Sequence, residues 1–492
     1  MRALPDQTLP ELWRSRVDRR GDHPALVTLG CDGETRTHSY DDLDRLAGGA
    51  AAMLGALGVR SGSTVVLHLA PGPELLAGFL AVAGLGAVAV VLHPDTPVEE
   101  CAQVVARTGA RVAVCPPGVA GRYTTQHVVD PADWTPGQRL PVHPIDGSTP
   151  VSIVFTSGST ATPKGVLLTH TNLVFSGRFV QWQAALTEDD RLLTTMPACH
   201  VNFQLNAMLP ILTAGGTLIV VDRYSARRFW RQVREQRATV VQSIAMMVRT
   251  QLCQPVEPGE RDHQVREVLY YLPITDAEKD EYTERFGVRL LNSYGNSECL
   301  VGAITDPPTG ERRWPSIGRV GPGYQARIAD EQGHALPDGE TGEIQLRGEP
   351  GVTFMAGYLD DPAATAALYD ADGWMHTGDL GHRDADGWFY FADRRSRVIK
   401  RGAENISPAR VEAVLAEHPA IAEASVIGVP DPIYDQAVKA VVAPKPGHAL
   451  TADAVIAHCA ARLPRFMVPT VVELVDHLPQ TRSFKVATSA LD

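Results

Sequence analysis

The first half of the chain alternates two kinds of segment, and this alternation limits the fold more than any other feature. Apolar runs of strand character, such as TVVLHLA at 64–70 and AVAVVLH at 87–93, are separated by segments with helical periodicity. A second series of the same kind runs from about 191 to 244. Continuous apolar strands between helices are typical of parallel βα units, in which helices cover both faces of the sheet. The sequence therefore predicts two α/β subdomains.

The pattern changes twice in the second half. From about residue 310, short Gly-rich segments such as GEIQLRG at 342–348 predict a mostly antiparallel β-region. After Asp393, helical and strand-like segments alternate in a short α+β tail. With 492 residues, the chain is too long for one ordinary core. We predict an α/β fold, with a large N-terminal domain over 1–396 and a small α+β C-terminal domain over 397–492.

Charge and composition exclude several classes of partner. The net charge is −12, and no run of Lys and Arg is longer than two residues, so we expect no nucleic-acid or anionic-membrane binding. No apolar stretch reaches the roughly 20 residues that span a bilayer, and the N-terminal segment lacks the apolar core of a signal peptide. The seven cysteines are scattered without a CxxC pair, which predicts free thiols. We expect a cytoplasmic protein whose partners are small molecules or proteins.

A hydroxyl-rich segment, TSGSTATPKG at 156–165, directly follows a predicted buried strand. Backbone amides and Ser/Thr hydroxyls in such a loop can surround phosphate oxygens, and Lys164 adds a positive charge. The segment differs from the Walker pattern, and by itself it is also typical of a solvated turn. Lysine is scarce in this chain, with six in all, so a lysine inside a motif carries more weight.

Four later segments have similar character. In NSYGNSECL at 292–300, Glu298 is a candidate ligand for Mg²⁺. In GWMHTGDLG at 373–381, Asp379 is predicted in a tight turn, where it could accept hydrogen bonds from a ribose diol. The segments DRRSRVIKRGAENISP at 393–408 and LPQTRSFK at 478–485 add further lysines. Alone, Glu298 would more often be a surface charge, and Asp379 is as typical of an ordinary β-turn as of a ribose site.

In this order, the five motifs resemble those of the acyl-adenylate-forming superfamily of acyl-CoA ligases, peptide-synthetase adenylation domains and luciferases. The resemblance extends over essentially the whole chain. Segments such as MPACH at 196–200 and RFGVRLLNSYG at 285–295 are most similar in appearance to the crotonobetaine/carnitine-CoA ligases. The resemblance implies an ATP-dependent acid–CoA ligase that uses Mg²⁺, forms acyl-AMP and then transfers the acyl group to CoA. It also implies that the C-terminal domain is mobile.

The resemblance assigns roles to residues of the motifs. Glu298 would bind Mg²⁺, and Lys485 would act in adenylation. Lys400 and Gly402, with Glu404 nearby, would serve the thioester step. The predicted nucleotide-binding residues are Thr156, Ser157, Gly158, Ser159, Thr160 and Lys164 at the β,γ-phosphates, Ser297 at the α-phosphate, Asp379 and Arg394 at the ribose, and Asn292, Ser293 and Tyr294 at the adenine.

The predicted acyl pocket contains no acidic side chain. By the resemblance, its members would be His200, Asn202, Phe203, Gln204, Ser243, Ala245, Met246, Tyr271, Leu272, Asn296 and Cys299. His200 is also a candidate catalytic residue, with a core or gating role as the alternative. A quaternary ammonium group would need a carboxylate or an aromatic cage. We therefore predict an uncharged acid, with room for a bulky one.

The chain departs from the family pattern at several positions. Ala161 stands where a glycine is usual, Arg397 where an aspartate is common, and Ala403 replaces a second glycine. Ser297 keeps the hydroxyl of the usual threonine. Phe484 replaces the glycine before the catalytic lysine. It either packs against the large domain or weakens adenylation.

Three other functions stay open from the sequence. The first is an enzyme specialised for forming thioesters from preformed acyl-AMP. The second is an adenylation enzyme that loads a carrier-protein thiol, and the third is a nucleotide-binding regulatory protein without turnover. A homodimer also stays open.

Overall fold

The structure is a computed structural model that describes residues 7–30, 33–156, 164–271, 274–394, 397, 399–401, 404–431, 435–463, 465–480 and 486–491. Two structural units can be distinguished. The first comprises Met1–Gln325 and Arg347–Tyr369, and the second comprises Ala326–Leu346 and Asp370–Asp492. The predicted domain boundary between residues 396 and 397 lies inside the second unit and remains a prediction.

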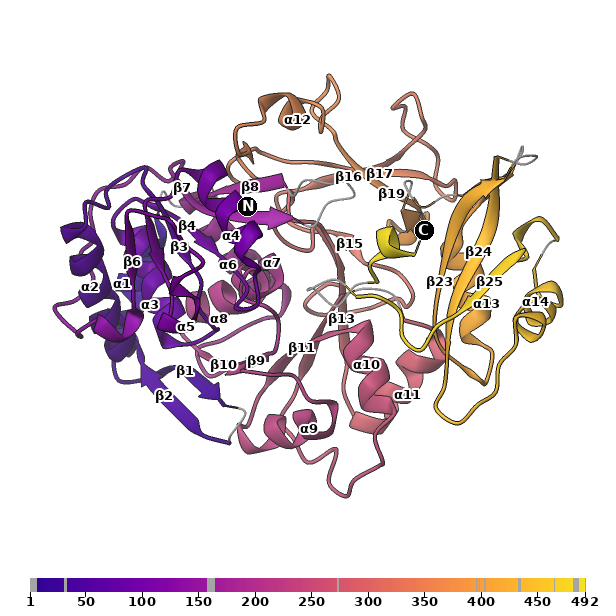
Figure 1. Ribbon diagram of the computed structural model, residues 1–492, viewed down its shortest axis with the longest axis horizontal. Helices are drawn as coiled ribbons and strands as arrows, with labels where there is room; N and C mark the ends of the chain where they lie inside the picture. The colour runs from indigo at the N-terminus through magenta and orange to yellow at the C-terminus, as the bar shows by residue number, and fades with distance from the viewer. Residues whose placement is uncertain are drawn as a thin grey trace. The chain divides into compact units, whose positions relative to one another are not determined.

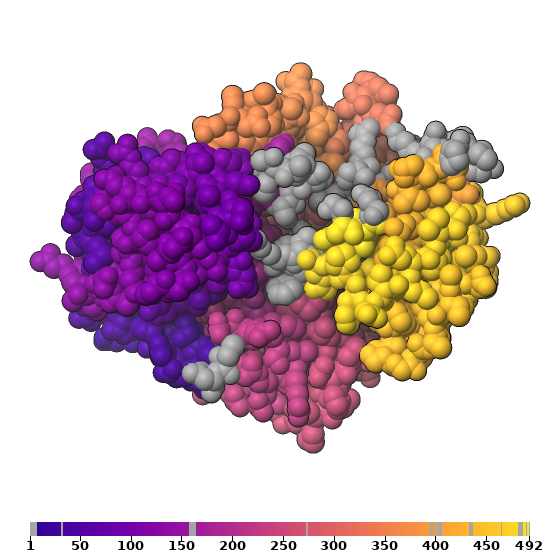
Figure 2. Space-filling view, in the orientation of Figure 1, coloured from indigo at the N-terminus to yellow at the C-terminus, as the bar shows by residue number. Residues whose placement is uncertain are grey.

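A seven-stranded sheet forms one half of the first unit, in the order β18-β8-β7-β4-β3-β5-β6 (Figure 1). Its strands are β3 (Thr64–Leu67), β4 (Val88–Val91), β5 (Val112–Val114), β6 (His127–Val129), β7 (Pro150–Thr156), β8 (Lys164–Thr169) and β18 (Gly357–Tyr358). Strands β3 to β7 pair in parallel, as the apolar runs predicted, whereas β8 is antiparallel to β7 and to β18. The chain from β3 to β7 belongs to the part coloured indigo to purple in the space-filling view (Figure 2).

A nine-stranded sheet forms the other half, in the order β15-β14-β13-β12-β11-β9-β10-β1-β2. Its strands are β1 (Pro24–Leu29), β2 (Thr35–Ser39), β9 (Arg191–Thr194), β10 (Thr217–Val221), β11 (Val240–Ile244), β12 (Glu267–Tyr271), β13 (Leu290–Tyr294), β14 (Ile304–Thr305) and β15 (Arg319–Val320). Strands β9 to β13 pair in parallel. The hairpin of β1 and β2 extends this sheet through a parallel pairing of β1 with β10, an addition that the sequence pattern did not indicate.

Helices surround both sheets of the first unit. They are α1 (Leu9–Arg20), α2 (Tyr40–Ala56), α3 (Pro73–Gly84), α4 (Val98–Thr108), α5 (Pro117–Ala120), α6 (His170–Gln183), α7 (Val201–Phe203), the π-helix η2 (Gln204–Met208), α8 (Leu209–Ala214), α9 (Ala226–Glu235), α10 (Ala245–Leu252), α11 (Asp276–Phe286) and α12 (Pro362–Ala366), with a 3₁₀ turn η1 (Pro131–Asp133). Figure 1 shows α9, α10 and α11 side by side, and they contact one another.

Local sequence explains where these helices begin and end. At α11, Thr275 and Glu278 form a capping box, in which each side chain bonds the backbone N–H of the other residue. Gly287 then ends the helix with a φ of 67°, a left-handed conformation that glycine adopts without strain.

The second unit contains two further sheets. The first has the order β16 (Gln325–Ala329), β17 (Gly342–Arg347), β19 (Met375–Arg383) and β20 (Phe389–Arg394), and β19 is antiparallel to both β17 and β20. The second has the order β22 (Glu404–Ile406), β21 (Ile399–Arg401), β24 (Asp435–Pro444) and β23 (Ile421–Asp431), with β25 (Val471–Leu474) parallel to β24. The helices are α13 (Pro408–Ala416) and α14 (Ala452–Ala460), with 3₁₀ turns η4 (Arg465–Met467) and η5 (Thr488–Ala490).

The core of the α+β tail lies between its sheet and its two helices. Ile406, Val411, Leu415, Val438 and Val455 are buried together in it. The predicted α/β class, with a β-rich region and an α+β tail, is therefore confirmed. Within the described residues, no helix combines the length and the apolar character needed to span a bilayer.

Candidate functional site

The two ends of the hydroxyl-rich loop are held together as strand partners. Thr156 ends β7, Lys164 begins β8, and the two residues pair in the antiparallel register. The Thr156 hydroxyl donates a hydrogen bond to the Lys164 carbonyl at 3.4 Å. Lys164 thus lies in a strand, not in the loop as the motif suggested, because the hairpin register extends to the last residues before the loop. The remaining predicted phosphate-binding residues, Ser157, Gly158, Ser159 and Thr160, and also Ala161, lie outside the described residues.

Lys164 belongs to a cluster with Tyr358 and Glu298, which we call the charged cluster. The Lys164 ammonium lies over the Tyr358 ring, 4.7 Å from its centroid. The Tyr358 hydroxyl donates a hydrogen bond of 2.7 Å to Glu298 Oε1. Burial raises the pKa of Tyr358, and the nearby charge of Glu298 raises it further. The phenol therefore keeps its proton and acts as the hydrogen-bond donor. The predicted phosphate-binding lysine and metal-binding carboxylate are therefore joined through one side chain.

The sequence did not single out Tyr358. It lies in the two-residue strand β18, which pairs with β8 so that Tyr358 is opposite Val166. Its backbone N–H also donates to the Thr365 hydroxyl at 2.8 Å. Nothing in the local pattern around residue 358 indicates this long-range pairing.

Glu298 projects from a constrained turn after β13. The Asn296 side-chain oxygen accepts a hydrogen bond of 2.9 Å from the Cys299 N–H, and the Met355 N–H donates to the Glu298 carbonyl at 2.9 Å. Leu300 has a φ of 70°, which is strained for a bulky residue and is found mostly where other contacts enforce it. Mg²⁺ is usually bound by one or two carboxylates together with substrate phosphates, so a single half-buried Glu298 fits that ion.

The predicted adenine-binding residues lie at the end of β13. Asn292 is buried, and its side chain donates to the Ser316 carbonyl at 2.9 Å. Its backbone N–H donates to Asp306 Oδ2 at 2.9 Å, and burial raises the pKa of Asp306 to about 6. The Ser293 hydroxyl is buried without a hydrogen-bond partner among the described residues, which suits a site for a polar ligand. Tyr294 and Ser297 are half-buried.

The segment that carries much of the predicted acyl pocket is fixed by neutral hydrogen bonds. His200 caps the short helix α7, because its Nδ1 accepts from the Asn202 N–H at 3.1 Å. The Gln204 amide donates to the Ala198 carbonyl at 2.9 Å. After Phe203 the helix widens into the π-helix η2, a distortion that often marks functional sites.

Gln242, which the sequence analysis did not select, anchors this segment to the sheet. Its side-chain amide donates to the Asn202 carbonyl at 3.0 Å, and its oxygen accepts from the Thr194 hydroxyl at 2.6 Å. Gln242 is fully buried in β11. A glutamine inside the apolar run VVQSI was the available signal, because a buried amide needs hydrogen-bond partners.

The structure does not bring all predicted acyl-pocket residues to one face. In the register of β11 and β12, Ser243 is opposite Tyr270 and Ile244 is opposite Tyr271. Because side chains alternate between faces, Ser243 and Tyr271 point to opposite sides of the sheet.

Several other members of the predicted pocket are buried. Phe203 and Ala245 have little exposed area, and burial raises the pKa of the Cys299 thiol to about 12. Met246 follows Ala245 in α10 and is half-buried. The Asn296 side chain is used in the turn described above. Leu272 lies outside the described residues.

The predicted ribose-binding pair lies in the second unit. Asp379 is in strand β19 opposite Arg394 in β20, and it is only 2% exposed. The tight turn predicted for Asp379 is therefore wrong. Gly378, with a φ of 70°, bends the chain inside the strand, where its N–H donates to Glu343 Oε1 at 3.0 Å.

The lysines of the C-terminal region can be placed only in part. Lys400 lies in β21, but its side chain, like that of Arg394, is outside the description, as are Gly402, Ala403, Phe484 and Lys485. Arg397 forms an ion pair with Glu412 of α13. The unusual arginine is thus bound to the helix that follows it.

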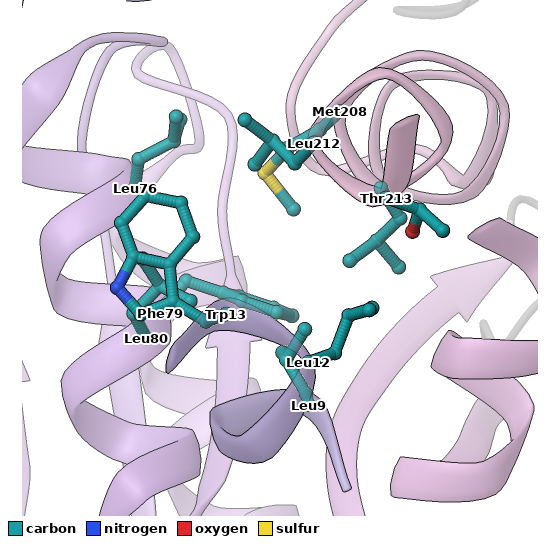
Figure 3. Close-up of a pocket in the computed structure, with 10 residues that line it drawn as sticks. Leu9, Leu12, Trp13, Leu76, Phe79, Leu80, Met208, Leu212 and Thr213 are labelled. Atoms are coloured by element: carbon teal, nitrogen blue, oxygen red, sulfur yellow. The ribbon is translucent and has the colours of Figure 1, made fainter. Parts of the chain in front are cut away.

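A small apolar cavity lies elsewhere in the first unit, in the core (Figure 3). It has a volume of about 20 Å³, and Leu9, Leu12, Phe79, Leu80 and Leu212 are among the residues that line it. It is far too small for an acyl group or a nucleotide, and its lining carries no charged side chain. It is a packing defect.

Comparisons with known proteins identify the family of the chain. Residues 13–359 match the AMP-binding enzyme family, and residues 410–485 match the AMP-binding enzyme C-terminal domain. The chain is 40% identical to the crotonobetaine/carnitine–CoA ligase of Proteus mirabilis over 99% of both chains. It is also 40% identical to the enzyme of the same name from Salmonella typhimurium over 98% of both.

Solved structures agree as well. ATP-bound MatB from Rhodopseudomonas palustris superposes with a TM-score of 0.88 at 25% identity, covering 99% of this chain and 98% of that one. The O-succinylbenzoate coenzyme A synthetase of Bacillus subtilis, in complex with AMP, gives 0.87 at 26% identity with the same coverage. The predicted resemblance, enzyme class and use of ATP, Mg²⁺ and CoA are thereby confirmed. The chain belongs to the AMP-binding enzyme family and is an ATP-dependent acyl-CoA ligase that works through an acyl-adenylate.

Proposed function

We propose that the acid activated by this ligase is uncharged, with room for a bulky acyl group. The observation that carries this proposal is the neutral hydrogen-bond network of Thr194, Gln242 and Asn202. Together with Gln204, these residues bring no carboxylate to the acyl segment. A buried cation without a counter-charge is strongly unfavourable, and the aromatic alternative requires rings arranged around it. An acyl chain without charge avoids both requirements.

A second candidate is a cationic acid. The relatives at 40% identity are named crotonobetaine/carnitine–CoA ligases, and the chain matches them along their whole length. Identity at this level supports the shared reaction more than the shared substrate, because substrate choice depends on a few pocket residues. The cationic acid therefore remains the competing outcome of the experiment below.

In the first step, the substrate carboxylate attacks the α-phosphorus of ATP, giving acyl-AMP and pyrophosphate. Both reactants are anionic, so the site must supply positive charge and position them. Lys164 would neutralise the β,γ-phosphates, Glu298 would hold Mg²⁺, and Lys485 would approach the α-phosphate. The metal ion, when bound, neutralises phosphate charge. Asp379 and Arg394 would fix the ribose.

In the second step, the thiol of CoA attacks the acyl carbonyl of acyl-AMP. The carbon–sulfur bond forms as the bond to the phosphate oxygen breaks, and AMP leaves. We assign Lys400 and Gly402 to this step. Cleavage of the mixed anhydride drives this step without further ATP. A carrier-protein thiol as acceptor, and an enzyme that performs only this second step, remain alternative outcomes.

A panel of carboxylic acids tests these proposals together. Formation of CoA thioesters would be followed with ATP, and separately with presynthesised acyl-AMP, alongside ATP–pyrophosphate exchange. We expect neutral acids to support both exchange and thioester formation. Activity confined to supplied acyl-AMP would indicate the thioester-only enzyme. Turnover of carnitine or crotonobetaine above all neutral acids would contradict the proposed substrate class.

A further inference from the structure

We infer that Tyr358 is a positioning residue that orients the carboxylate of Glu298 for the metal ion and keeps Lys164 available for phosphate. This inference rests on the proposed roles of Lys164 and Glu298. Tyr358 touches both residues and would act on the nucleotide only through them.

The hydrogen bond selects one carboxylate oxygen. Tyr358 donates to Oε1 of Glu298, so Oε2 is the oxygen left for a metal ion. A carboxylate that is held in one orientation before the ion binds loses less freedom on binding. The phenol is itself fixed, because it is 7% exposed and its strand pairs with β8.

The ring also separates opposite charges. Lys164 lies in β8 and Glu298 in the turn after β13, and no ion pair joins these oppositely charged side chains in the part of the chain that the structure describes. The Tyr358 ring occupies the place next to the ammonium. A direct ion pair would neutralise both groups and would have to break when phosphate and metal bind. A cation–π contact holds the ammonium more weakly, so phosphate oxygens can replace it.

The test is ATP binding by calorimetry, with no acid present so that no turnover occurs. The dissociation constant would be measured in excess Mg²⁺ and in EDTA for the wild type, Tyr358→Phe and Tyr358→Leu. Tyr358→Phe keeps the ring and removes the hydroxyl. It should weaken binding about 10-fold in Mg²⁺ but less than about twofold in EDTA. Tyr358→Leu removes the ring as well and should also weaken binding in EDTA, about fivefold.

Two controls separate this role from a structural one. Tyr224→Phe removes another phenolic hydroxyl of the first unit, bonded to Thr250 at 2.7 Å, and should leave both constants unchanged. Thermal melting would confirm that each variant is folded. If Tyr358→Phe binds ATP like the wild type in Mg²⁺, the inference is overturned.

Glu298→Gln distinguishes this failure from a failure of the proposed function. If Glu298→Gln loses the Mg²⁺-dependent gain and Tyr358→Phe does not, only the inference fails. If neither variant loses it, both the metal-binding role of Glu298 and the inference fail. In the double variant Tyr358→Phe with Glu298→Gln, we expect no loss beyond that of Glu298→Gln. Additive losses would contradict action through Glu298.

Discussion

Two regions of the first unit differ in how their polar side chains are bonded. In the acyl segment, Thr194, Gln242 and Asn202 are neutral and form hydrogen bonds with one another inside the protein. In the charged cluster, Lys164 lies over the ring of Tyr358, and Glu298 accepts a hydrogen bond from the hydroxyl of the same tyrosine. Under the proposed assignment, the acid binds beside side chains that are neutral and already hydrogen-bonded to one another. Under the same assignment, the phosphates of ATP would replace the contact of Lys164 with the Tyr358 ring.

The largest effect should come from removing positive charge on the nucleotide side. Lys485→Ala should lower acyl-AMP formation about 10²–10³-fold, because a lysine that stabilises developing charge in a dry site contributes a few kcal/mol. Thioester formation from supplied acyl-AMP should change far less. Pyrophosphate exchange and a single-turnover thioester assay measure the two steps.

Lys445→Ala is the matched control, since Lys445 is an exposed lysine of the same C-terminal region. It should leave both assays unchanged. Equal losses in the two steps for Lys485→Ala would remove the assignment of this lysine to adenylation.

On the acyl side, Gln242→Leu should act on the acid and not on ATP. It leaves the part-buried Asn202 carbonyl without this donor and the buried Thr194 hydroxyl without this acceptor, which should cost about 2 kcal/mol of stability. Loosening of α7 should raise the KM for the acid about 10-fold, while the ATP dissociation constant stays the same. Gln232→Leu, on the partly exposed side of α9, serves as the control. A change in ATP affinity equal to that for the acid would show that the two regions are not independent.

Asp306, beneath the predicted adenine site, should show a pH dependence. Burial raises its pKa from the ordinary 3.8 to about 6. Between these two pH values the folded state therefore binds more protons than the unfolded state. The contribution of protonated Asp306 to the free energy of unfolding is present at low pH and is lost as the pH rises through about 6. Asp306→Asn should raise stability by about 2 kcal/mol at pH 8 and by little at pH 4. Apparent melting temperatures across this range would measure it, and a gain that does not grow with pH would contradict the assignment.

The smallest effect should come from the core cavity, which lies outside both regions. The Thr213 hydroxyl is buried without a hydrogen-bond partner among the described residues, and Thr213 lines the cavity. Thr213→Val removes that hydroxyl and should stabilise the protein by about 0.5–1 kcal/mol. Substrate and ATP affinities should not change. Destabilisation in a melting experiment would mean that the hydroxyl has a partner.

The local pattern of apolar residues was enough to predict most of the fold. The apolar runs at β3, β4, β10 and β11 identify parallel strands, because such strands are buried on both faces. The hairpin of β1 and β2 could not be placed in this way, since β1 pairs with β10, whose residues lie about 190 positions later. Pairing between distant segments depends on how the whole domain packs. A short stretch of sequence therefore does not show which distant strand it will pair with.

The candidate site shows the same limit at the level of single residues. Glu298 and Lys164 stand in motifs and were identified, whereas Tyr358 reaches them only because β18 pairs with β8. The sequence prediction placed Ser243 in the acyl pocket, but its neighbour Gln242 is the residue that bonds the Asn202 carbonyl. One step along a strand moves a side chain to the opposite face, and sequence alone does not determine that register.

The central claim is that the acyl side of the site is built for an acid without charge. A competition between crotonobetaine and its carbon isostere 5,5-dimethylhex-2-enoic acid tests it most directly, because the two differ only in the charged nitrogen. Both acids would be offered together with ATP, Mg²⁺ and CoA, and the two CoA thioesters would be counted by mass spectrometry. We expect the neutral thioester to exceed the cationic one by about 100-fold, since an unpaired buried charge costs several kcal/mol. An excess of the cationic thioester would contradict the account.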